Sequence, residues 1–154
     1  METKQQNDIQ IKQNNIVRWV IAILTILLYA IFYIADGAVI GVDTVGYINS
    51  VVSREAGYSL WVQLFRNFFG DNSYADVLVL CQMIFATVTT YVFTFSISKI
   101  WRVRPFSVFV IWGIQVMFLV LCRFGSGLGA IYPSTVLTEG LTYSLYFLYI
   151  LLTI

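Results

Sequence analysis

Two acidic residues lie where a carboxylate can do acid–base chemistry at the edge of a membrane. Asp43 follows the first apolar stretch in IGVDTVGYI, and Glu139 lies near the start of the last one in PSTVLTEGLTYS. A carboxyl group between water and hydrocarbon is partly desolvated, which raises its pKa and makes it a usable base. At Asp43 the sequence favours the simpler role of a helix cap. At Glu139 a functional role, usual for ionisable groups inside spans, and a merely interfacial position stay equally open.

Few other groups are able to do chemistry. The chain has no histidine, which excludes histidine-based triads and histidine-ligated zinc. Arg123 closes the third apolar stretch and is able to bind an anionic headgroup or a phosphate, although snorkelling of its side chain to the interface is the simpler explanation. We expect Cys81 and Cys122 to be small buried hydrophobic residues. We expect Gln82 and Gln115, inside apolar stretches, to form interhelical hydrogen bonds.

The elements that position these groups are predicted to be membrane-spanning helices. Apolar residues make up 59% of the 154-residue chain and charged residues 11%, against about 45–50% and about 25% in a soluble domain. A bilayer core roughly 30 Å thick needs about 20 mostly apolar residues per helix. We therefore predict an all-α polytopic membrane protein with a polar cytoplasmic tail over 1–15 and a transmembrane domain over 16–154. The predicted spans cover residues 16–35, 75–97, 106–121 and 136–154.

The outside loop over residues 36–74 is too long for a simple connection, and we expect one or two amphipathic helices in it that lie in the membrane interface. The stronger candidate is Tyr58–Phe69, which has an apolar face, and the weaker is Asp43–Ser53. The face consists of Leu60, Trp61, Leu64, Phe65 and Phe68. The turn sequence Gly70-Asp71-Asn72 is expected to end the stronger helix.

The distribution of charge predicts the topology. The net charge is +1, which implies no global attraction to nucleic acid. Basic residues precede the first span and lie between the second and third, whereas the segment 36–76 carries five acidic residues against two basic ones. Because basic residues in short loops mark the cytoplasmic side, we expect the amino terminus inside and the 36–74 loop outside.

The order of these features resembles the amino-terminal part of GT-C glycosyltransferases, and the resemblance covers residues 16–154. Asp43 is followed by Tyr47-Ile48, Gly57-Tyr58, the LWVQLFRNFFGD helix, the Gln-bearing span VLCQMIFATVTTYVF and finally YPSTVLTEGLTYSLYFL. Enzymes of this family are polytopic and use sugars linked to polyprenyl phosphate. They include the dolichyl-phosphate-mannose protein mannosyltransferases and the bacterial lipid A aminoarabinose transferases.

This resemblance implies a role for each candidate residue. Asp43 matches the first-loop catalytic Asp, which is the base or the orienting group for the acceptor, and Glu139 matches a Glu that borders the same cavity. Tyr47 belongs to the implied substrate-binding set, and Arg54 or Arg123 is expected to hold the phosphate of the sugar carrier. The implied location is the plasma membrane of a bacterium, with transfer on its outer side. No cofactor is identified, and a divalent metal ion stays open.

The chain departs from the family pattern in two ways. Thr44 stands where some members have a second acidic residue, and family members are far longer. We therefore expect remaining spans or a partner subunit to complete the enzyme. The alternative is a non-enzymatic membrane protein, either an assembly subunit or part of a small transporter. In that case Asp43 and Glu139 would be structural or would bind ions.

Overall fold

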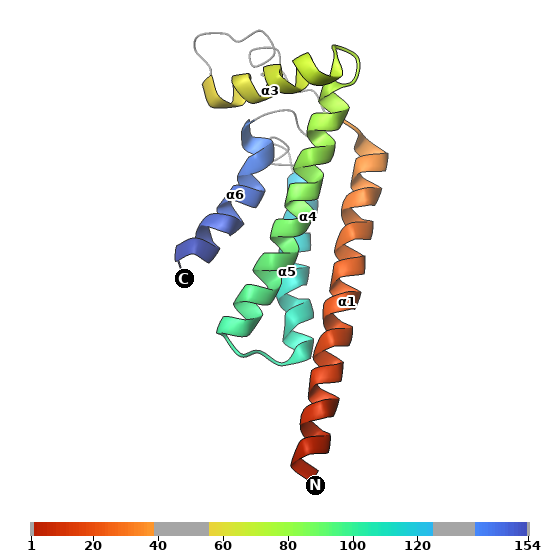
Figure 1. Ribbon diagram of the computed structural model, residues 1–154, viewed down its shortest axis with the longest axis vertical. Helices are drawn as coiled ribbons and strands as arrows, with labels where there is room; N and C mark the ends of the chain where they lie inside the picture. Colours follow the sequence, from red (N-terminus) through yellow and green to blue (C-terminus); the bar gives the residue numbers. More distant parts are fainter. Residues whose placement is uncertain (1, 39–55, 125–137, 154) are drawn as a thin grey trace.

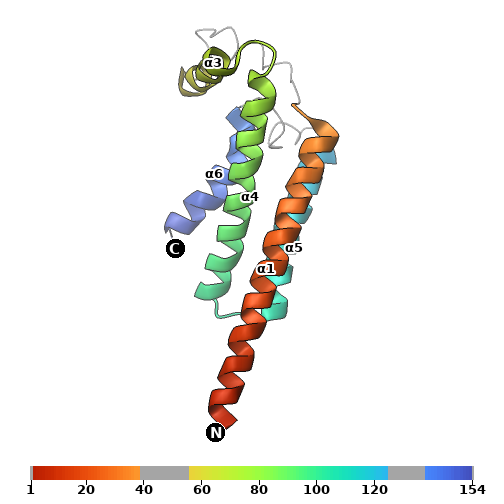
Figure 2. The same cartoon turned by 45° about the vertical axis from the view of Figure 1, so that its right-hand side comes forward.

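The computed structural model describes residues 2–38, 56–124 and 138–153, and within these ranges the chain forms helices and no strand. This confirms the all-α class. The helices are α1 (Glu2–Asp36), α3 (Ala56–Phe69), α4 (Tyr74–Ile100), α5 (Pro105–Phe124) and α6 (Thr138–Thr153). Figures 1 and 2 show α1, α4, α5 and α6 running along the long axis of the molecule, while α3 lies across one end of α4.

Within the described ranges, two helices are long and apolar enough to cross a membrane. They are the 24-residue stretch Gln13–Asp36 of α1 and the 27-residue helix α4. At 1.5 Å per residue these are about 36 and about 40 Å long, against roughly 30 Å of hydrocarbon. The apolar parts of α5 and α6, Pro105–Leu121 and Ser144–Thr153, are shorter. Helix α1 also continues through the polar residues 2–15, where Glu, Lys and Gln favour helix.

Helix α4 is the centre of the bundle and packs against each of the other four helices. The core is an apolar cluster to which α1, α3, α4 and α5 all contribute, and α4 supplies more of its members than any other helix. Its buried residues are Tyr29, Phe32, Tyr58, Val62, Phe65, Tyr74, Leu78, Val79, Met83, Ala86 and Leu119. The cluster lies toward the end of α4 that α3 covers (Figure 1).

Polar side chains link the helices in the interior, as the two glutamines predicted. The Gln82 Nε2 group donates to the Tyr58 hydroxyl of α3 at 3.0 Å. The Gln115 Nε2 group of α5 donates to the Thr94 hydroxyl of α4 at 2.7 Å. Such bonds between membrane helices contribute about 0.6 kcal/mol on average and up to about 1.7 kcal/mol. The interhelical role of both glutamines is therefore confirmed.

Helix α1 is tied to its neighbours in the same way. The hydroxyls of Tyr29 and Thr90 lie 2.9 Å apart, which joins α1 to α4. The Trp112 indole N–H of α5 donates to the Thr25 hydroxyl of α1 at 2.9 Å. Because polar groups in an apolar interior need partners, these bonds fix the rotation of each helix about its axis.

The predicted helix Tyr58–Phe69 is confirmed as α3, but its apolar face is divided. Phe65 points into the bundle with Tyr58 and Val62, which are spaced by four and three residues and are buried. The remaining four residues of the predicted face, Leu60, Trp61, Leu64 and Phe68, are exposed. Helix α3 therefore has one apolar stripe against the protein and a second directed outward. The weaker helix candidate, Asp43–Ser53, lies outside the described residues.

The turn after α3 has the predicted chemistry. Gly70 adopts a positive φ of 76°, a conformation that favours glycine, and its N–H donates to the Arg66 carbonyl at 2.9 Å. This ends α3 and lets α4 begin four residues later. The expectation that Cys81 is buried was wrong, because its side chain is exposed where α4 faces away from the core cluster. The side chain of Cys122 is outside the described set.

Candidate functional site

The ends of several helices meet at one end of the bundle, which we call the α3 end. Here α1 and α5 finish, α4 and α6 begin, and α3 lies across (Figures 1 and 2). The chain alternates in direction through α1, α4, α5 and α6, which brings these four termini to the same level. The segments that contain the sequence-predicted residues adjoin these termini.

An ion pair between α1 and α5 marks the α3 end. Arg123 donates from Nε to Asp36 Oδ2 at 2.8 Å and from Nη2 to Asp36 Oδ1 at 2.6 Å. The side chains are 25% and 17% exposed, so this two-point contact is largely shielded from solvent. The guanidinium carbon also lies 5.0 Å from the centre of the Phe32 ring and 4.7 Å from that of Phe124.

Helix dipoles disfavour the charge of one member of this ion pair and favour the charge of the other. Asp36 is the last residue of α1, where the negative end of the dipole disfavours a carboxylate. Arg123 is in the last turn of α5, where a cation is favoured. The positive charge of Arg123 therefore offsets the unfavourable interaction between the Asp36 carboxylate and the dipole of α1. The sequence analysis counted Asp36 only among the acidic residues of the loop and missed this contact.

The other predicted residues fall mostly outside the described side chains. Asp43, Tyr47 and Arg54 lie outside the described residues, so their roles stay predictions. Glu139 is the second residue of α6, and only its place on that helix is described. Arg123 is the one predicted site residue whose contacts are described, and its role in holding a phosphate also stays a prediction, now with Asp36 as its neighbour.

A cavity of about 300 Å³ lies where α3, α4 and α6 meet, at the lower limit of typical ligand sites. It is lined by Trp61 of α3, by Cys81, Gln82 and Phe85 of α4, and by Leu141 of α6. Gln82 is 2% exposed, and its Oε1 atom has no hydrogen-bond partner within the described part of the chain. A buried amide oxygen without a partner is costly, and this atom has less than 1 Å² of accessible surface, so a ligand in the cavity reaches it only if the side chains around it move.

Glu139 lies two residues before Leu141, and Leu141 lines this cavity. The cavity thus joins α3, the glutamine-bearing helix α4 and the start of α6, which carries Glu139. Sequence reasoning identified Gln82 as an interhelical contact but missed its second, unsatisfied atom. The fold alone reveals it, since the partner of each amide atom depends on helix packing.

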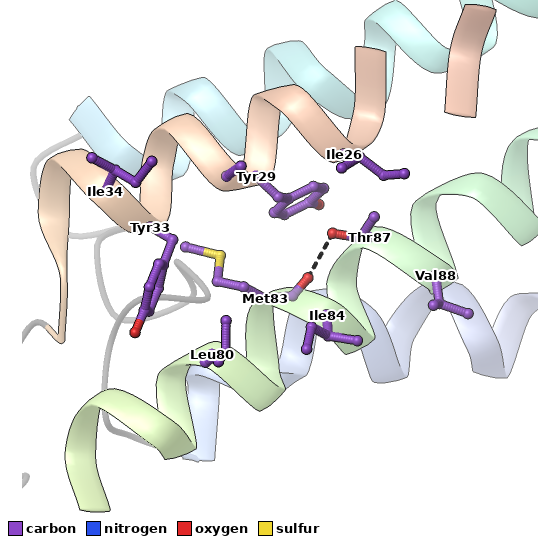
Figure 3. Close-up of a pocket in the computed structure, with 10 residues that line it drawn as sticks. Ile26, Tyr29, Tyr33, Ile34, Leu80, Met83, Ile84, Thr87 and Val88 are labelled. Atoms are coloured by element: carbon purple, nitrogen blue, oxygen red, sulfur yellow. Dashed lines mark hydrogen bonds between the residues drawn. The ribbon is translucent and has the colours of Figure 1, made fainter. Parts of the chain in front are cut away.

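A second groove, of about 420 Å³, runs between α1 and α4 and differs in chemistry. Figure 3 shows Tyr29 and Tyr33 of α1 facing Met83 and Thr87 of α4 across it. The hydroxyl groups in this groove have partners: Thr87 donates to the Met83 carbonyl at 2.8 Å, Tyr29 contacts Thr90, and Tyr33 donates to a backbone carbonyl. The groove therefore offers a hydrocarbon surface and no reactive group.

Electrostatics at the α3 end involve one further pair. Arg66 in the last turn of α3 contacts Asp71 in the following turn, and both side chains are well exposed. The hydrogen bond and the charge of Arg66 lower the pKa of the Asp71 carboxyl below its ordinary value. Among the described residues, no three His, Cys, Asp or Glu side chains are close enough to hold a metal ion.

The comparisons with known proteins give no relative. No family model, no curated protein and no solved structure matches this chain.

Proposed function

We propose that this chain is the amino-terminal part of a membrane glycosyltransferase. It transfers a sugar from a polyprenyl-phosphate carrier to an acceptor on the outer side of a bacterial plasma membrane. The observation that supports this proposal is the cavity between α3, α4 and α6, which Gln82 lines and which Glu139 precedes by two residues along α6. Trp61 supplies an aromatic surface to this cavity, of the kind that lines small-molecule sites.

The proposal assigns four spans and an orientation. Helices α5 and α6 cross the membrane with α1 and α4, α3 lies in the outer interface, and the amino terminus is cytoplasmic. The alternation of helix direction supports this arrangement (Figure 1). So does the charge distribution, because Lys99, Arg102 and Arg104 lie at the end opposite α3.

Labelling of Asn72 tests the orientation. Asn72 is exposed in the turn between α3 and α4. In a background with Cys81→Ser and Cys122→Ser, Asn72→Cys is expected to react with an impermeant maleimide in intact cells, because this turn faces outward. Reaction only after lysis would contradict the proposed orientation.

The catalytic prediction concerns Asp43. Asp43→Asn keeps the shape and the capping capacity of the side chain but removes the base. In the full-length enzyme we expect sugar transfer to fall by about 10²–10⁴-fold, the usual contribution of a positioned general base. The measurement is the rate of radiolabelled sugar transfer, normalised to the amount of protein, which should barely change.

The matched control is Asp71→Asn, which removes a carboxylate from the same end at an exposed position outside the cavity. It should transfer sugar at the wild-type rate. If Asp43→Asn also keeps that rate, Asp43 is a helix cap and the enzyme proposal fails at its central residue. A loss of the protein itself in Asp43→Asn would assign a structural role, as expected for an assembly subunit.

A further inference from the structure

At the end of the bundle opposite α3, which we call the turn end, the α4–α5 connection Trp101–Arg104 lies beside α1 (Figure 2). A pocket of about 200 Å³ lies here between α1, α4 and the start of α5. Its polar lining comes from Asn14 and Arg18 of α1 and from Ser98 and Lys99 of α4. The guanidinium carbon of Arg18 lies 5.8 Å from the centre of the Phe95 ring, which also lines the pocket.

The positive charge of this pocket is not compensated. Neither Arg18 nor Lys99 forms an ion pair within the described residues. Arg102 and Arg104 in the adjacent connection add two exposed cations that likewise have no acidic partner there. Four cations in one small region repel one another, so an anion between them is favoured.

Local helix geometry accounts for Lys99 but not for Arg18. Lys99 is in the last turn of α4, where a cation is favourable beside the negative end of the dipole. Arg18 lies in the middle of α1, far from either terminus of that helix, and gains no such compensation. The pocket also adjoins Pro105, the first residue of α5, so the positive end of the α5 dipole adds to its potential.

The level of the pocket identifies the source of the anion. Asn14 is the second residue of the apolar stretch Gln13–Asp36, and Lys99 is the penultimate residue of α4. Both potential spans therefore end at this pocket, which is the level of lipid headgroups if they cross the bilayer. Lipid phosphates are concentrated at that level, and cytoplasmic leaflets carry anionic lipids.

We propose that this pocket binds the phosphate of an anionic membrane lipid, with Arg18 and Lys99 as its main contacts. The Arg18 guanidinium supplies paired N–H donors in the geometry that suits phosphate oxygens, and the Lys99 ammonium acts as a point charge. Val17 and Val108 line the pocket as well and offer an apolar surface to the lipid. This inference rests on the membrane placement of α1 and α4 and not on sugar transfer.

Native mass spectrometry of the full chain, in a neutral detergent, tests the proposal. Dissociation constants are measured for phosphatidylglycerol and for phosphatidylcholine with identical acyl chains. The anionic lipid should bind the wild type about tenfold more tightly. Arg18→Gln should reduce this preference by about tenfold, the factor that corresponds to about 1.4 kcal/mol. Arg18→Lys, which keeps the charge but loses the paired donors, should fall between them.

The matched controls are Arg102→Gln and Arg104→Gln, which remove the same charge from exposed positions outside the pocket lining. They should change the preference by no more than roughly twofold, because exposed charges are screened. An equal loss in the three glutamine variants, with none in Arg18→Lys, would overturn the proposal in favour of diffuse attraction to a basic surface. Displacement of the lipid by an equal concentration of glycerol phosphate would also overturn it, since the site would then bind a soluble phosphate.

These outcomes are independent of the sugar-transfer assay. If the protein prefers phosphatidylglycerol through Arg18 but Asp43→Asn has no effect on sugar transfer, the lipid-site proposal stands and the enzyme proposal fails. The reverse pattern keeps the enzyme and removes the lipid site. The side chains of Arg18, Arg102 and Arg104 are exposed, so an unchanged helical circular dichroism spectrum is expected for each arginine variant.

Discussion

At the α3 end, the arginines of α3 and α5 each contact an aspartate, whereas at the turn end four cations have no acidic partner within the described residues. The two paired arginines link parts of the fold: Arg123 joins α1 to α5, and Arg66 joins the end of α3 to the next turn. The unpaired cations make no such bond. The difference indicates that charge serves packing at one end and ligand binding at the other.

The largest effect is expected from breaking the shielded pair at the α3 end. Arg123→Ala removes this two-point contact from Asp36 at the unfavourable end of α1. We expect the free energy of unfolding in micelles to fall by about 2–3 kcal/mol, somewhat less than the loss of about 3–5 kcal/mol when a fully buried pair is broken. Denaturation by sodium dodecyl sulfate, followed by tryptophan fluorescence, measures this change.

Asp36→Ala should cost less than Arg123→Ala. It leaves a cation at the favourable end of α5, where Phe32 and Phe124 still contact the guanidinium. The double variant should lose less than the sum of the two single losses, because both remove one interaction. Equal single losses would contradict the dipole argument, and full additivity would show that Asp36 and Arg123 contribute to stability independently of each other.

An intermediate effect is expected when an arginine at the turn end is given an acidic partner, as the arginines at the α3 end have. Asn14→Asp places a carboxylate in the pocket four residues before Arg18, the spacing of an ion pair on one helix. We expect the stability to rise by no more than about 0.5 kcal/mol. The preference for phosphatidylglycerol should fall by about fivefold, because the new carboxylate competes with the lipid phosphate for Arg18 and each cation near an anionic surface contributes about 1 kcal/mol.

The neighbouring change Gln13→Glu is the control, since it adds the same charge to α1 outside the pocket lining and five residues before Arg18, a spacing at which the two side chains are not neighbours on the helix. It should leave most of the lipid preference intact. Equal effects of the two variants would mean that net charge, and not the pocket, determines binding at the turn end. The same mass spectrometry experiment measures both variants.

The sequence predicted the parts of this comparison that depend on local pattern. The helix at 58–69, its glycine turn and the interhelical bonds of Gln82 and Gln115 follow from periodicity, turn chemistry and the cost of a polar group in an apolar helix. The two helices that are long and apolar enough to cross a membrane follow from length and composition. Each of these features is determined within one segment of the chain.

The parts that escaped prediction depend on which helices become neighbours. Asp36 and Arg123 are separated by 87 residues, and their contact follows from α1 and α5 ending at the same level. A signal was present, because an acidic and a basic residue each close an apolar stretch that runs in the same direction. The exposure of Cys81 and the division of the α3 face likewise depend on how α3 and α4 pack together.

The smallest effect is expected at the exposed pair, Arg66 and Asp71, which separates pairing from shielding at the α3 end. Arg66 lowers the pKa of the Asp71 carboxyl mainly by a hydrogen bond and to a smaller extent by its charge. A lowered folded-state pKa stabilises the turn above the unfolded value of roughly 3.9, and this contribution is lost as the pH falls through the folded value. No change is therefore expected between pH 7 and pH 5, and a small loss of order in the turn is expected only below about pH 4.

Titration of the Asp71 carboxyl carbon by NMR should give a higher pKa in Arg66→Gln than in the wild type, with a smaller difference at high salt. Identical titrations in the two proteins would show that an exposed contact at this end contributes nothing, and that shielding by the bundle is what makes the Asp36–Arg123 pair effective.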